Sequence, residues 1–212
     1  MADSKVSALT ELAVEPDSTD ELYINDGGVS KRIKWSTVKS VFTTLFGTGA
    51  TMTTGAGAGF TGGTGTIYKN SVVASGGVIT TEILFDLTGL GSSTTDLDII
   101  GQGASVAHMG RILAAQQGTA LTVELKCLEA PAGGVTDLDL YSATESSGVF
   151  DGLVTSLTET ALITAGGAWT AGLVKTAAVV PAANDYLYLT CGAAGTPGTY
   201  TAGKFLLTIK GY

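Results

Sequence analysis

The sequence contains little charge, little cysteine and almost no histidine. Charged residues make up 14% of its 212 residues, with two cysteines and one histidine, whereas soluble domains average about 25% charged residues. A chain of this length buries a core without disulfide bridges. The start of the chain has no apolar segment of the kind found in a secretory signal, so we expect synthesis in a reducing cytoplasm. This favours two buried free thiols, Cys127 and Cys191, over a bridge.

Basic residues and long apolar runs are also scarce. Eleven Lys and Arg against 19 Asp and Glu give a formal net charge of −8. This argues against nucleic acid or an anionic membrane as the main partner, because both attract a basic surface. No apolar run approaches the roughly 18 residues that a membrane-spanning helix needs. A mean hydropathy of +0.34 with so few charges predicts an assembly component, whose surface is largely covered by identical or different subunits in the working state.

The composition divides the chain into three segments. Residues 1–46 hold five of the eleven basic side chains and predict a separate module. Residues 47–66 contain eight glycines and no charge, which predicts a flexible linker or an arm that lies extended along another surface. Residues 67–212 carry the pattern of the main domain.

The first module predicts a hairpin followed by a helix. Residues 21–35 predict two short strands around Asp26-Gly27-Gly28, since Gly supplies the positive φ that a tight turn requires. Residues 36–47 predict a helix, because Ser36 suits its N-cap and Gly47 its C-terminal end. The apolar residues of this helix share one face, which needs a surface to lie against. They are Val38, Val41, Phe42, Leu45 and Phe46.

Residues 67–212 alternate apolar and polar side chains in short segments that turn-forming residues interrupt. This period of two is the pattern of strands with one buried face. In this pattern Leu121 shares the apolar face of its segment, whereas Tyr186, Tyr188 and Thr190 lie opposite the apolar face of theirs. About eight to ten strands without a long helix predict an all-β fold, a jelly-roll-like β-sandwich. The segments are 67–73, 78–88, 95–100, 105–115, 121–127, 136–141, 160–164, 173–180, 186–191 and 204–210.

Three strings resemble catalytic motifs but lack the surroundings that the chemistry needs. Residues 57–62 fit GxGxxG, without the preceding strand and following helix that receive a dinucleotide. Residues 198–205 nearly match a phosphate-binding loop, but Phe205 stands where a Ser or Thr would hold Mg²⁺. Ser105 and His108 are three residues apart, so on a strand their side chains point to opposite faces and form no dyad. We therefore predict no enzymatic activity and no cofactor.

A repeated Thr-Asp-Leu-Asp string is the one pattern that suits a metal. Asp96 and Asp98 form one pair and Asp137 and Asp139 the other. Two carboxylates two residues apart share a strand face and have the chemistry to hold a hard cation such as Ca²⁺. The alternative, which we favour, is that the intervening leucines face the core and the aspartates face solvent.

The N-terminal segment resembles the attachment segment that begins many virion proteins of tailed bacteriophages, such as tail fibres, head fibres and capsid-decorating proteins. The resemblance lies in residues 3–12, Asp20-Glu21-Leu22-Tyr23-Ile24 and residues 27–39. The strings at 86–90, 139–144, 183–189 and 200–205 are similar to structural proteins of environmental phages. The resemblance implies a non-enzymatic virion protein, usually trimeric, that docks through its N-terminus. It implies attachment roles for Leu22, Ile24, Lys31, Ile33 and Trp35, to which the predicted helix adds Val38 and Phe42.

Three functions are compatible with these observations. We expect a capsid decoration protein, clamped on the shell by its N-terminal module and forming a homotrimer outside it, because the chain is much shorter than a receptor-binding fibre and lacks a shaft. The second possibility is a tail or head-fibre component whose jelly roll binds a host-surface glycan. The third is a free carbohydrate-binding or hydrolytic domain, in which Tyr186, Tyr188 and Tyr200 would flank a groove; trimer contacts account for these tyrosines equally well.

Overall fold

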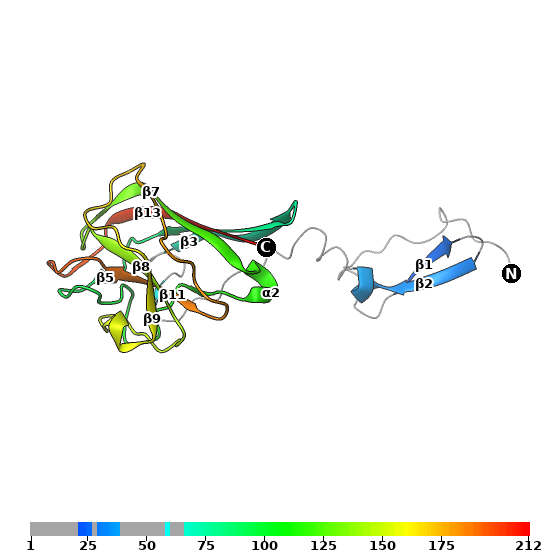
Figure 1. Cartoon of the computed structure of the whole chain (residues 1–212), viewed down its shortest axis with the longest axis horizontal. Coiled ribbons are helices and arrows are strands. Elements are labelled where there is room, and N and C mark those ends of the chain that lie inside the picture. Colours follow the sequence, from blue (N-terminus) through cyan, green and yellow to red (C-terminus); the bar gives the residue numbers. More distant parts are fainter. Residues whose placement is uncertain (1–20, 27–28, 39–57, 60–65) are drawn as a thin grey trace. The chain divides into compact units, whose positions relative to one another are not determined.

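The computed structural model describes residues 21–26, 29–38, 58–59 and 66–212 (Figure 1). The chain forms two compact units, residues 1–47 and 48–212. In the first unit, β1 (Glu21–Asp26) pairs antiparallel with β2 (Val29–Lys34), so that Leu22 lies opposite Ile33. The predicted hairpin is therefore present. Residues 35–38 form a helical turn, and the remainder of the helix predicted over 36–47 lies outside the described residues.

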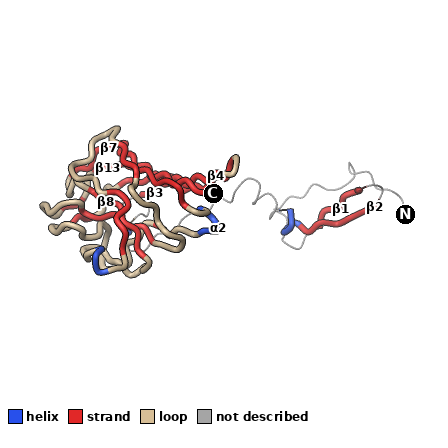
Figure 2. Tube along the Cα trace, viewed as in Figure 1, coloured by secondary structure: helices blue, strands red, loops and turns tan. Residues whose placement is uncertain are grey.

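The second unit is built from two antiparallel sheets, and strands make up most of its regular structure (Figure 2). The first sheet has the strand order β10-β7-β13-β4-β3, and the second has the order β6-β11-β8-β9. A short pair, β5 with β12, lies outside both sheets. The strands of the first sheet are β3 (Thr66–Ser75), β4 (Val78–Asp86), β7 (Ala120–Ala132), β10 (Val174–Thr176) and β13 (Ala202–Gly211). Those of the second are β6 (Gly110–Arg111), β8 (Leu138–Ala143), β9 (Glu159–Ile163) and β11 (Tyr186–Cys191).

This strand order is that of a jelly roll. Without the edge strand β3, the sheets read β10-β7-β13-β4 and β6-β11-β8-β9, so the chain passes repeatedly from one sheet to the other. The sequence prediction of an all-β, jelly-roll-like sandwich is confirmed. The remaining short elements are β5 (Gly91–Ser92), α2 (Ala114–Gln117), a 3-10 turn at Val154–Ser156 and β12 (Gly198–Thr199).

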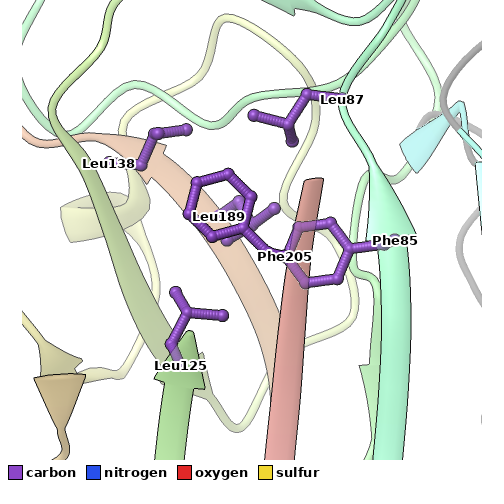
Figure 3. Close-up of a pocket in the computed structure, with 6 residues that line it drawn as sticks. All are labelled: Phe85, Leu87, Leu125, Leu138, Leu189 and Phe205. Carbon is purple, nitrogen blue, oxygen red and sulfur yellow. The ribbon is translucent and has the colours of Figure 1, made fainter. Parts of the chain in front are cut away.

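The main core lies between the two sheets, where the alternating side chains of β4, β7 and β13 point inward as predicted. Figure 3 shows the centre of this core, where side chains of both sheets meet and leave no room for a water molecule. The indole of Trp169 closes the core: it packs edge-on against Phe205 at 5.4 Å between ring centroids, and its Nε1 donates a hydrogen bond to Leu138 O at 2.8 Å. The residues in Figure 3 are Phe85, Leu87, Leu125, Leu138, Leu189 and Phe205.

A second, smaller core lies on the outer face of the second sheet, where the sequence predicted solvent. Side chains of the loops around 93–109 and 145–157 cover this face. The first of these loops runs along the edge of β11 that does not pair with β8, where Ile100 N and Met109 N donate hydrogen bonds to Leu189 O and Leu187 O. The strand predicted over 95–100 is reduced to isolated antiparallel bridges, such as the one between Ile99 and Thr190 of β11, after a turn at residues 96–97. The strand predicted over 105–115 is reduced to β6 followed by α2. The buried members of this core are Ile99, Ala107, Tyr141, Ala143, Val154 and Tyr188.

Three further details refine the predicted organisation. Ala58, in the segment predicted to be a linker or arm, is buried in the main core, and a Cβ on neighbouring Gly59 would lie 2.6 Å from Leu90 Cδ2. Cys127 and Cys191 are free and buried, which agrees with the prediction of two buried free thiols. Within the described ranges, no helix has the length and apolar character needed to cross a membrane.

Candidate functional site

The residues predicted to attach the protein to a particle gather in the first unit. The β1–β2 ladder places Leu22 opposite Ile33 and Ile24 opposite Lys31. Ile33, Trp35 and Val38 are half-buried and Lys31 is exposed, whereas Phe42 lies outside the described residues. The indole Nε1 of Trp35 is buried and has no hydrogen-bond partner within the described part of the chain. Apolar side chains at Ile33, Trp35 and Val38 thus remain partly available for a contact.

An apolar patch occupies one end of the first sheet, and we call it the end patch. It consists of Val73, Val78, Leu121 and Tyr212, whose exposed fractions are 52%, 40%, 53% and 65%. The register brings these residues together: Ser75 pairs with Val78, Ile79 with Gly211, and Gly211 with Ala120. Tyr212 in turn exchanges backbone hydrogen bonds with Thr119. The β3–β4 hairpin and the C-terminus lie at this end in Figure 1.

The end patch corrects one sequence prediction. Leu121 was expected on the buried face of its strand, but the strand's inward positions begin with Val123 and Leu121 is exposed. Several exposed apolar side chains at one end of a sheet are typical of a surface that binds another protein. Alternation alone gave no sign that residues 73, 78, 121 and 212 would meet.

An acidic cluster lies beside the end of β11. Asp137 and Asp139 come at the start of β8, and the loop segment 95–98 passes close by, since Leu97 N donates to Cys191 O at 2.8 Å. The expectation that these aspartates face solvent is wrong for Asp98 and Asp139, which are both 5% exposed. Both are buried because the loop around 93–109 covers the outer face of the second sheet. Asp137 is half-buried and Asp96 is exposed.

Electrostatics in this cluster oppose ionisation. Burial is the main cause that raises the pKa of Asp139, and the negative charges of Asp137 and Asp96 raise it further. Burial and the charge of Asp96 likewise raise the pKa of Asp137. Backbone hydrogen bonds oppose this effect, among them the one that Ala165 N donates to Asp139 Oδ1 at 2.7 Å. The positive charge of Lys175 also lowers both pKa values.

A hydrogen-bond network on the same side holds the covering loops together. The hydroxyl of Ser93 donates to Asp98 Oδ2 at 2.6 Å and also contacts the Asp151 carboxylate. Leu97 and Asp151 have positive φ values of 68° and 64°, a conformation that is uncommon for non-glycine residues and rare for leucine. The network therefore ties two loops at a point where the backbone is strained.

The sole histidine packs among tyrosines. His108 is buried, its ring centroid is 4.9 Å from that of Tyr186 and 6.3 Å from that of Tyr188, and its Nδ1 has no partner in the described structure. Burial lowers its pKa. Ser105 is exposed and sits in a bend, not on a strand. The argument from strand geometry therefore does not apply to these two residues. What separates them in the structure is exposure, since Ser105 is exposed and His108 is buried.

The tyrosines proposed to line a glycan groove or a trimer contact are mostly internal. Tyr188 and Tyr200 are buried, and Tyr186 is half-buried under the guanidinium of Arg111 at 5.2 Å. The hydroxyl of Tyr200 donates to Val135 O at 2.7 Å. Both uses of Tyr188 and Tyr200 are therefore wrong, and Tyr212 in the end patch is an exposed tyrosine that the sequence prediction did not include.

The candidate sites among the described residues are the apolar side chains of the first unit, the end patch and the acidic cluster. In the part of the chain that the structure describes, no three His, Cys, Asp or Glu side chains are placed to hold a metal ion by themselves. The string 198–205 forms β12 and the start of β13, so no helix follows it to bind phosphate. No family model, no curated protein and no solved structure matches the chain.

Proposed function

We propose that the protein is a non-enzymatic structural component of a tailed-phage virion that decorates and stabilises the outside of the capsid. Its first unit would anchor it to the shell, and its jelly roll would contact neighbouring copies, as in a homotrimer. The observation that carries the proposal is the division of the chain into a small N-terminal unit and a solidly packed jelly roll. The resemblance of the N-terminal segment to phage attachment segments indicates which unit is the anchor.

Two properties of the jelly roll support a role in assembly. The end patch exposes apolar surface, and burial of a Val or Leu that is about half exposed contributes roughly 1 kcal/mol in a contact. The centre of the sandwich is filled by side chains, so recognition would take place on the outer surface. Binding of many copies to the folded shell would stabilise it by mass action.

Deletion of residues 1–46 tests the anchor. Because residues 48–212 form a compact unit with its own core, we expect the shortened protein to keep its far-ultraviolet circular dichroism and its cooperative unfolding. We expect it to lose co-sedimentation with phage heads that lack the protein. Full-length Glu124→Gln, changed on an exposed strand position, is the control that should still bind. Full occupancy of heads by the shortened protein would refute the anchor assignment.

A role at a tail or head fibre is the alternative that the same particles distinguish. Immunogold labelling or an averaged image of intact virions should show many copies over the head for a decoration protein. Labelling confined to a few positions at the tail or at fibres would support the fibre alternative. Binding of the isolated jelly roll to a glycan array would favour a carbohydrate-binding role.

A further inference from the structure

The acidic cluster beside β11 combines residues from three separate stretches of the chain. Asp137 and Asp139 lie on one face at the start of β8, and Gly192 follows the end of the neighbouring strand β11, with Gly192 N donating to Asp137 O at 2.8 Å. Asp96 belongs to the loop that covers this face, and its charge acts on both Asp137 and Asp139. Buried Asp139, half-buried Asp137 and exposed Asp96 are thus neighbours at this end of the second sheet.

Gly192 lets two of these carboxylates pack against the backbone at the end of β11. A Cβ at this residue would lie 2.6 Å from Asp137 Oδ1 and 2.8 Å from Asp139 Oδ1, so any side chain would collide with both. Gly192 is not among the glycines with positive φ, so its backbone conformation does not require glycine. The lack of a side chain therefore allows Asp137 Oδ1 and Asp139 Oδ1 to approach the same point of the backbone, which places the two carboxylates close to each other.

Two buried oxygens facing this region have no partner among the described residues. Thr190 is 0% exposed and its Oγ1 makes no hydrogen bond. It pairs directly with Asp139 in the β8–β11 ladder, so both side chains lie on the same face of the sheet. Asp137 Oδ1 is also buried and unpartnered. Buried polar atoms in folded proteins are nearly always paired. A hydroxyl and a carboxylate oxygen without partners on this side of the sheet therefore point to a bound species that oxygen atoms coordinate, such as a cation.

Among the described residues, Lys175 is the cation whose charge acts on this acidic cluster. Its Nζ donates to Ala165 O at 2.7 Å. One ammonium group therefore acts on both Asp137 and Asp139. The negative charges of Asp98 and Asp151 also act on the adjacent Cys191, which adds to the negative potential on this side of the sandwich.

We propose that this cluster binds one Ca²⁺ ion through the carboxylates of Asp137 and Asp139 and the hydroxyl of Thr190. The nearby Asp96 adds negative charge, and water completes the coordination. A set of two carboxylates and a hydroxyl is a hard-oxygen site, and Ca²⁺ accepts the irregular geometry of such a site more readily than Mg²⁺ does. This inference is independent of the proposed role in a virion.

The full-length protein is to be titrated with Ca²⁺, and separately with Mg²⁺, by isothermal calorimetry. Its thermal midpoint is then compared in EDTA and in millimolar Ca²⁺. We expect saturable binding of Ca²⁺, weaker binding of Mg²⁺, and a higher midpoint with Ca²⁺, because an ion that binds only the folded state stabilises it. Absence of saturable Ca²⁺ binding up to millimolar concentration would overturn the proposal, and tighter binding of Mg²⁺ would overturn the choice of ion.

Two variants separate a cation site from a merely structural cluster. Asp137→Asn removes one negative charge, so in EDTA it should be at least as stable as the wild type, whereas its Ca²⁺ affinity should fall by about tenfold or more. Thr190→Val keeps the shape and removes an unpartnered hydroxyl, and we expect the same pattern with a smaller loss of affinity. Glu124→Gln, an equal change of charge at an exposed position, should bind Ca²⁺ like the wild type. Unchanged Ca²⁺ affinity in both Asp137→Asn and Thr190→Val would refute the assignment of these ligands.

Discussion

Replacement of Tyr188 by Phe tests whether the covered outer face of the second sheet is a true core. Tyr188 is fully buried on β11, and its hydroxyl joins two loop positions to the sheet. It donates to Glu145 O at 2.8 Å and accepts from Gly148 N at 3.3 Å. A Cβ at Gly148 would lie 2.7 Å from Tyr188 Cε1, so the loop backbone packs directly on the ring.

The cost of Tyr188→Phe follows from the groups left behind. The ring and its packing remain, whereas the amide of Gly148 and the carbonyl of Glu145 lose their partner. A buried polar group without its partner costs about 1–3 kcal/mol. Because the Glu145 carbonyl is only partly buried, we place the total at about 2–3 kcal/mol. For a unit of this size, this corresponds to a thermal midpoint lower by roughly 4–12 °C.

The measurement is urea unfolding followed by circular dichroism, with a thermal scan as a second probe. Tyr212→Phe is the matched control: Tyr212 is 65% exposed, and a surface substitution of this kind stays within about 0.5 kcal/mol of the wild type. If Tyr188→Phe also stays within this range, the hydroxyl is not holding the loop and the account of a second core is wrong.

Two further predictions concern pH. Burial raises the pKa of Tyr188 to about 12 and also raises the pKa of Tyr200 and Tyr141, while tyrosines in the unfolded chain lose their protons near pH 10. The contribution of these tyrosines to the free energy of unfolding should therefore be constant below pH 10 and fall as the pH rises from 10 to 12; urea unfolding across this range checks it, and a flat profile between pH 10 and 12 would contradict it. Burial lowers the pKa of His108. The imidazole is therefore protonated near pH 6.5 in the unfolded chain but only at lower pH in the folded chain. Stability should consequently decrease from pH 7 to pH 5 and decrease less in His108→Gln, and an identical decrease in both proteins would exclude His108 as the cause.

Much of the fold was predictable where one face of a strand meets solvent. Alternation identified the inward residues of β4, β7 and β13 because the outer face of the first sheet carries polar groups such as Glu82, Glu124 and Lys210. The same reasoning failed on β11, where Leu187, Tyr188, Leu189 and Thr190 are all buried. When both faces of a strand are covered, the alternation of apolar and polar residues no longer indicates which side chains are buried.

The candidate sites were predictable only in part, since they depend on which segments the fold brings together. The string Thr-Asp-Leu-Asp marked Asp137 and Asp139 as possible ligands, but nothing local in the sequence joined them to Thr190 or Gly192, more than fifty positions later. The end patch likewise combines residues from both ends of the jelly roll's sequence.

The sequence by itself determined the all-β class, the hairpin at 21–34 and the central strands, because these follow from local propensity and from the period of apolar side chains. Tertiary structure alone decided that the loop around 93–109 runs along the edge of β11 and that its side chains cover the outer face of the second sheet. That packing buries Asp98, His108 and Tyr188 and creates the acidic cluster. The reason is physical: burial of a residue depends on all the chain that surrounds it, and the loop that excludes water from β11 is held by contacts between residues far apart in sequence.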